Sequence, residues 1–139
     1  MDEFTWAAFA CYLWAMLGGA LSGFTYLLRS KFMPYHQEAL GQSWDQLDKR
    51  LQTLFIAFMR SAGGAVLGGV TSVVIILFIP FRADELWAHY AIPGVGLISF
   101  LPALYATLIV KTRTKASTPV AFVASGVAFI IIGFILSFF

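Results

Sequence analysis

Four long stretches of this chain contain no Asp, Glu, Lys or Arg, and they constrain the fold more than any other feature. They are 21 to 25 residues long and lie at 4–28, 61–81, 86–110 and 116–139. Because a helix rises about 1.5 Å per residue, roughly 20 residues cross the hydrocarbon core of a bilayer. The pattern therefore predicts an all-α integral membrane protein in which four transmembrane helices form an antiparallel bundle.

The composition favours a lipid environment over other classes of protein. Charged residues make up 12% of the 139 residues, against about 25% in soluble domains. The net charge of +2 is small and the charged residues lie in the loops, so nucleic acid is not an expected partner. The acidic N-terminus and the length of the first apolar stretch favour a permanent span over a cleaved signal peptide.

Helix-breaking and capping residues set the expected limits of the elements. Pro34 disfavours helix at Met33, so the first helix is expected to end by about Lys31. Ser43 and Gln46 fit a capping box, which predicts that a second helix begins near Ser43, extends on the cytoplasmic side and ends at Pro80.

Pro93-Gly94 is expected to end a second connection over Arg82–Gly94, while Pro102 lies inside the third span. The chain is thus expected to form one transmembrane domain over 1–139. Its spans are predicted at about 4–28, 58–80, 94–111 and 118–139, with a cytoplasmic loop at 29–50.

Lys and Arg are distributed unequally among the loops, which predicts an orientation. The second loop has only Arg82, and the two chain ends have none. Seven others flank the first and third loops: Arg29, Lys31, Lys49, Arg50, Lys111, Arg113 and Lys115. Because basic residues near span ends mark the cytoplasmic side, we expect both termini outside the cytoplasm, in a membrane such as the bacterial inner membrane.

Two glycine pairs are the most specific packing signal in the chain. Gly19 and Gly23 in the first span, and Gly64 and Gly68 in the second, have the GxxxG spacing. Small residues at this spacing allow two helix backbones to approach closely in lipid. The pairs predict helix contacts inside one chain, with a self-association face and a glycine-lined solute path as alternatives.

Arg60 and Tyr105 are candidate polar or ligand-facing residues of the spans. Arg60 is the only charged residue within a long apolar run, and it is expected either to anchor the helix at the headgroups or to face a ligand or partner. Tyr105 would contribute to the wall of a solute path together with Thr25, Arg60, Ser61, Thr71 and Ser72.

Tyr35 and His36 are the candidates in the first loop. His36 could act as a base with Glu38 or Asp45, or as a metal ligand. His89 is predicted on the opposite side of the membrane, so the two histidines are not expected to share a metal.

No catalytic motif, metal-binding motif or cofactor-binding fingerprint is present in the sequence, and no cofactor is predicted. The leading interpretation is a small membrane protein without evident catalytic chemistry, acting as an accessory, scaffold or lipid-interacting subunit. Membrane lipid, other membrane subunits or a second copy are its expected partners. An oligomeric channel or carrier for a small solute is the first alternative. A membrane-surface enzyme that uses His36 is the second.

Overall fold

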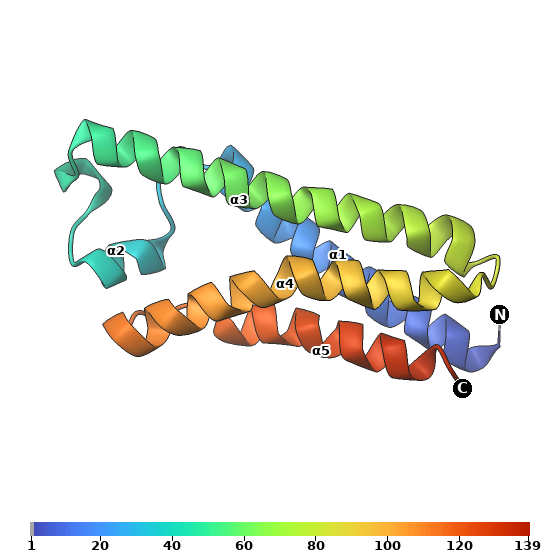
Figure 1. Ribbon diagram of the computed structural model, residues 1–139. Coiled ribbons are helices and arrows are strands. Elements are labelled where there is room, and N and C mark those ends of the chain that lie inside the picture. Colours follow the sequence, from blue (N-terminus) through green and yellow to red (C-terminus); the bar gives the residue numbers. More distant parts are fainter. Residues whose placement is uncertain (1) are drawn as a thin grey trace.

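The computed structural model describes residues 2–139, which are all-helical and contain no strand. Four long helices lie side by side and a short one lies at one end of them (Figure 1). They are α1 (Glu3–Leu28), α2 (Pro34–Leu40), α3 (Lys49–Ile76), α4 (Leu86–Thr114) and α5 (Val120–Leu136). Three helical segments are long and apolar enough to cross a membrane, namely Glu3–Leu28, Lys49–Phe81 and Leu86–Thr114, while α5 is apolar but shorter.

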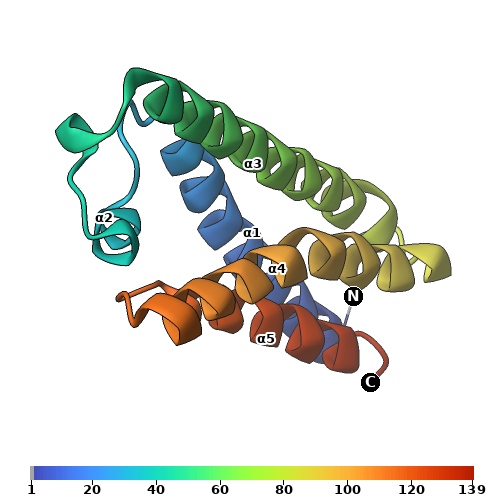
Figure 2. The same ribbon diagram turned by 60° about the vertical axis from the view of Figure 1, so that its left-hand side comes forward.

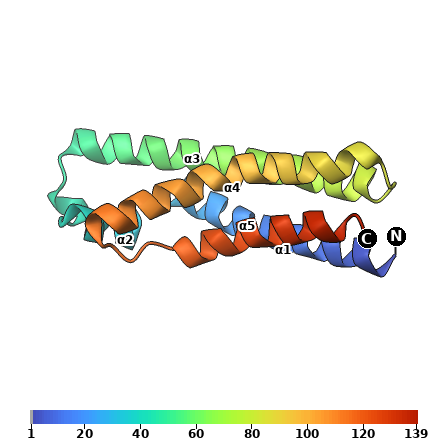
Figure 3. The same ribbon diagram turned by 60° about the horizontal axis from the view of Figure 1, so that its bottom comes forward.

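The four long helices alternate in direction around a square. α1 packs along α3 and α5, and α4 packs along the same two helices, so that α1 and α4 occupy opposite corners. Both chain ends and the 82–85 turn lie at one end of the bundle, and α2 lies at the other (Figure 3). The first and third loops therefore share an end, as do the termini and the second loop.

The tightly packed core lies between the helices in the half of the bundle near the termini. Its largest fully buried side chains include Tyr12, Phe81, Ile92 and Ile130, which come from all four sides. Toward the middle of the bundle the ring of Phe100 fills the space between α1 and α5. A Cβ added at Gly19 or Gly126 would lie within 2.9 Å or 2.6 Å of this ring, so a larger residue at either position would displace the ring.

Glycines bring the backbones of α1 and α3 together, although only one of the predicted pairs takes part. A Cβ at Gly63 would lie 2.7 Å from the carbonyl oxygen of Gly23. By contrast, no atom lies within 4 Å of a Cβ placed at Gly64 or Gly68, and both glycines are exposed. The prediction that Gly64 and Gly68 pack inside the chain is therefore wrong, because the helix presents the adjacent Gly63 to α1.

The segment between α1 and α3 is more structured than the sequence predicted. α1 ends at Leu28, as expected from Pro34, but Pro34 also begins α2 as its first residue, a position that suits its fixed φ. The predicted Ser43–Gln46 cap forms, with Ser43 N donating to Gln46 Oε1 at 2.8 Å.

This cap stabilises only a single 3₁₀ turn, η1 (Trp44–Gln46). The prediction that the long helix begins near Ser43 is therefore wrong. α3 begins at Lys49, where Asp48 caps it by accepting from Arg50 N at 2.8 Å.

Two prolines lie inside helical segments. The sequence predicted instead that a helix would end at the first proline and that a connection would end at the second. Pro80, which has no N–H to donate, falls in a π turn, η2 (Leu77–Phe81). The predicted connection over Arg82–Gly94 is wrong, because α4 begins at Leu86 and continues through Pro93. Pro93 is buried against neighbouring helices, and such packing allows a membrane helix to tolerate proline.

Candidate functional site

A cavity of about 520 Å³ lies between the helices at the end of the bundle where α2 sits. Its walls come from α1, α3 and α4, with contributions from α2 and α5. Figure 2 shows α3 and α4 close together near the 82–85 turn and diverging toward the end at which α2 lies. This volume is within the range of about 300–1,000 Å³ that is typical of small-molecule sites.

Small side chains on facing helices create this cavity. Ala62, Ala103 and Ala106 all line it, and their side chains are too short to fill the space between the helices. The ring of Phe100 also lines the cavity, and behind it lies the packed half of the core. The cavity therefore begins where large core side chains give way to small ones.

The cavity is open sideways, toward the surroundings of the bundle. Three of its lining residues are strongly exposed: Leu21 and Phe58 at 65% each and Phe122 at 46%. An apolar chain could therefore enter from the side of the bundle without passing through the packed core.

Three hydroxyl groups on the cavity wall are already hydrogen-bonded within their own helices. Thr25 donates to Leu21 O at 2.7 Å. Ser99 and Thr107 each donate to a carbonyl of α4 at 2.9 Å. These hydroxyl hydrogens are not free to bind a polar solute, so the wall presents mainly apolar surface.

The polar end of the cavity is built by α2 and the end of α1. The hydroxyls of Tyr26 and Tyr35 are hydrogen-bonded to each other. His36 lies beside them, with its ring centroid 4.2 Å from that of Tyr35. All three residues line the cavity.

His36 also holds α2 in place. Its Nδ1 accepts a hydrogen bond from Met33 N at 3.3 Å, and its backbone N donates to Met33 O at 2.9 Å. This arrangement resembles a capping box, in which the third helical residue usually is Glu or Gln. At the other end of α2, Gly41 adopts a left-handed conformation with φ of 66°, which suits glycine.

The first loop covers the end of the bundle and is tied to several helices. Phe32, Leu47 and Met59 form a second buried cluster, with Trp44 and Phe55 packed against it. On the other side of the loop, Glu38 Oε2 accepts from Ser117 N at 2.7 Å, which joins α2 to the turn before α5. The loop thus forms a cap beside the cavity rather than a free linker.

Burial favours the neutral forms of Tyr35 and His36. It raises the pKa of the Tyr35 hydroxyl, an effect to which the hydrogen bond with Tyr26 adds. It lowers the pKa of His36 below the usual value of 6.5. Both side chains are therefore neutral near pH 7.

The structure brings together only two of the predicted polar residues, Tyr35 and His36. Arg60 is exposed on α3 and Tyr105 is 68% exposed on α4, and neither lines the cavity. Of the predicted solute-path residues only Thr25 lines it.

The carboxylates predicted as partners of His36 are bound elsewhere. Glu38 binds Ser117, and Asp45 pairs with Lys31 at 3.3 Å. The pairs His36–Glu38 and His36–Asp45 are not hydrogen-bonded within residues 2–139.

Sequence reasoning missed the small residues of α4 that shape the cavity. Ala103, Ala106, Thr107 and Val110 recur at three- and four-residue steps, which is the signal of one helix face. The sequence also provided no reason to select Tyr26, which is the hydrogen-bond partner of Tyr35.

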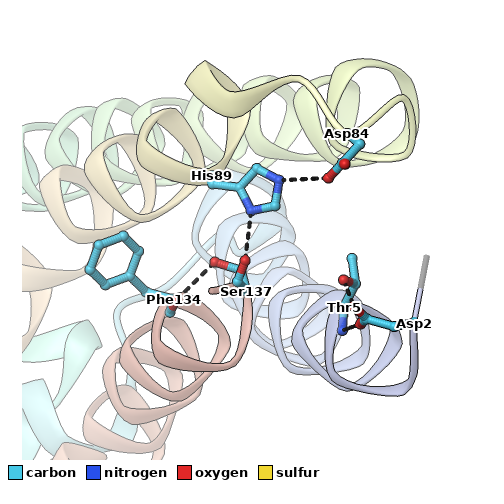
Figure 4. A network of polar contacts seen from close by, with 6 residues as sticks. All are labelled: Asp2, Thr5, Asp84, His89, Phe134 and Ser137. Carbon is cyan, nitrogen blue, oxygen red and sulfur yellow. Dashed lines mark hydrogen bonds and ion pairs between the residues drawn. The ribbon is translucent and has the colours of Figure 1, made fainter. Parts of the chain in front are cut away.

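A second polar cluster lies at the opposite end of the bundle, around the buried His89 (Figure 4). His89 Nδ1 lies 3.1 Å from the carbonyl oxygen of Ser137, and its Nε2 lies 3.5 Å from Asp84 Oδ1. These contacts join the start of α4 to the end of α5. His89 thus fastens two helices, far from His36.

Comparison of the chain with protein-family models, curated proteins and solved structures found no match. Its function is therefore inferred from its own residues.

Proposed function

We propose that this protein is a four-span membrane protein that holds a lipid-like molecule in its interhelical cavity. The fourth span would be α5, which is about 26 Å long, close to the hydrocarbon thickness of about 30 Å. Its packing along both α1 and α4 supports a position inside the same membrane.

The orientation we propose has both termini outside the cytoplasm. The segments that carry seven of the nine Lys and Arg residues share the end at which α2 lies. Basic residues beside spans favour the cytoplasmic side. The cavity would then lie in the cytoplasmic half of the membrane, capped by the first loop.

The cavity itself is the observation that carries the proposed function. It has the volume of a small-molecule site, mainly apolar walls and a sideways opening at Leu21 and Phe58. In a membrane, the molecules that meet such an opening are lipids and other apolar-chain compounds. No assembled nucleophile or acid–base pair accompanies the cavity among residues 2–139, so binding alone, as in an accessory or lipid-handling subunit, is the role it supports.

Filling the cavity tests this function. In Ala62→Phe and Ala103→Phe, the new ring would occupy space that the ligand needs. The protein would be purified in a mild detergent, and its bound lipids would be counted by native mass spectrometry. We expect each variant to retain about tenfold less of the ligand, because a ligand that must displace the new ring would lose about 1.4 kcal/mol of binding free energy.

Ala57→Phe is the matched control. Ala57 is also exposed on α3, yet it does not line the cavity. This variant should keep the ligand of the native chain. Equal retention of bound lipid by all three variants would overturn the proposed function.

A further inference from the structure

His36 offers a hydrogen-bond donor at the polar end of the cavity. Its Nδ1 already accepts from Met33 N, so a neutral imidazole must carry its hydrogen on Nε2. Within residues 2–139, no protein atom accepts a hydrogen bond from this Nε2. The donor is therefore available to a molecule in the cavity, which His36 lines.

The tyrosine pair supplies a second donor beside the first. One hydroxyl of Tyr26 and Tyr35 donates to the other, and the accepting hydroxyl keeps its own hydrogen. Both rings lie near His36, with centroids 6.4 Å and 4.2 Å from its imidazole. Two donors thus lie on neighbouring residues that line one end of a mainly apolar cavity.

The cavity offers nothing to balance a charged headgroup. Among the residues described, none that lines it is Asp, Glu, Lys or Arg. Burying an unpaired charge is costly, whereas a neutral polar group needs only hydrogen bonds. A carbonyl oxygen fits this requirement, because its two lone pairs can accept from two donors at once.

We propose, on the basis of the function inferred above, that the ligand is an uncharged amphiphile whose carbonyl oxygen accepts from His36 Nε2 and from the Tyr26–Tyr35 pair. Its apolar chain would lie along the small residues of α3 and α4 and leave through the sideways opening. Lipid-soluble quinones and neutral acylglycerols share this chemistry.

A binding assay with matched probes tests the proposal. Decylubiquinone and dioctanoylglycerol are the two neutral carbonyl probes, and the anionic probe is dioctanoyl phosphatidylglycerol. Decylbenzene has a ring and a chain of the same length as decylubiquinone but no oxygen. Each would be titrated against the full chain in detergent by native mass spectrometry. At least one neutral carbonyl probe should bind more tightly than the anionic one. Of the two neutral probes, the one that binds more tightly indicates whether the ligand is a quinone or an acylglycerol.

Removing the donors should weaken only the probes that carry a carbonyl. In His36→Leu, we expect the neutral probe that binds more tightly to lose about fivefold in affinity. This is the loss expected when one hydrogen bond is removed. The double variant Tyr26→Phe/Tyr35→Phe keeps both rings and should show a similar loss. Decylbenzene should bind equally to the native chain and to the tyrosine variant, which leaves the Met33–His36 cap in place. Gln37→Leu, an exposed position of α2 that does not line the cavity, is the control.

The outcomes separate this inference from the proposed function. Unchanged binding of both neutral probes to His36→Leu and to the tyrosine variant would overturn the inference. So would tighter binding of the anionic probe. If Ala62→Phe still abolished binding in those cases, the cavity would remain a ligand site. If Ala62→Phe also bound normally, both proposals would fall.

Discussion

Two adjacent glycines of α3 have opposite surroundings. A Cβ at Gly63 would lie 2.7 Å from Gly23 O and 2.8 Å from Leu27 N, and both of these are backbone atoms that cannot rotate away. At Gly64, one residue further, the same Cβ would meet no atom within 4 Å. The separation of α1 and α3 therefore depends on Gly63.

Alanine substitution should affect stability differently at these two positions. We expect Gly63→Ala to lower the free energy of unfolding by about 2 kcal/mol, because α1 must move away from α3. Gly64→Ala should cause no loss, since an exposed helical glycine gains up to about 1 kcal/mol on replacement by alanine. Thermal unfolding of the two variants in the same detergent would measure the difference. Equal losses would mean that Gly64 makes a contact absent from the single chain.

The glycine pattern shows what spacing can and cannot predict at the scale of a residue. Gly19 and Gly23, which have the GxxxG spacing, lie at helix contacts. On α3, however, Gly63, Gly64, Gly68 and Gly69 offer several overlapping choices. Neighbouring residues differ by about 100° around a helix, so only the packed structure decides which one faces α1. Self-association through Gly64 and Gly68 remains a prediction.

At the scale of the element, α2 depends on a neutral histidine. The Nδ1 of His36 accepts from Met33 N, and protonation of that nitrogen would remove the acceptor. The pKa of His36 is lowered by burial in the folded loop, so the opened loop binds a proton more readily. The stability that His36 contributes is therefore present above about pH 6.5, the usual value, and is lost as the pH falls below it.

We expect the first loop to open more readily at pH 5.5 than at pH 7.5. Hydrogen exchange of the amides in 29–48, corrected for the intrinsic effect of pH, would measure the opening. The change should stay well below about 1.4 kcal/mol per pH unit, because solvent reaches part of the ring.

His36→Gln serves as the control for this pH dependence. Its side-chain oxygen can still accept from Met33 N, as in an ordinary capping box, but it does not titrate. Loop opening in this variant should be almost independent of pH. The same acid-induced opening in both chains would assign the effect to a group other than His36.

The two misjudged helix starts have a common cause. Ser43–Gln46 and Pro93-Gly94 are both local signals. The cap predicted at Ser43 forms, whereas the break predicted at Pro93-Gly94 does not. The length of each element was decided instead by packing. The cap at Ser43 serves a single turn beside Phe32, whereas burial of Ile92 and Pro93 carries α4 through a sequence that would otherwise form a turn.

At the scale of the whole molecule, the helical class and the three long apolar segments follow from length and charge, but the cavity does not. Its walls come from five helices that are far apart in the sequence. Residues such as Ala62 and Ala103 look like any membrane-facing alanine until the divergence of α3 and α4 places them opposite each other. Tyr35 and His36 could be selected as polar candidates, but their partner Tyr26 required the fold.

The arrangement of the ends decides which side of the membrane the cavity serves. We propose that the 82–85 turn lies outside and that α2 and the turn before α5 lie in the cytoplasm. In a Cys11→Ser background, Ala83→Cys should react with a membrane-impermeant maleimide added to intact cells. Thr114→Cys should react only after permeabilisation. Both positions are exposed, so burial would not explain a difference.

The reverse labelling pattern would invert the proposed topology and place the polar end of the cavity outside the cytoplasm. Labelling of both positions in intact cells would contradict the four-span arrangement itself, because the two turns lie at opposite ends of the bundle (Figure 3). The expected pattern would instead mean that the donors of His36 and Tyr35 meet molecules of the cytoplasmic leaflet. The sideways opening at Leu21 and Phe58 would then receive its ligand from that leaflet.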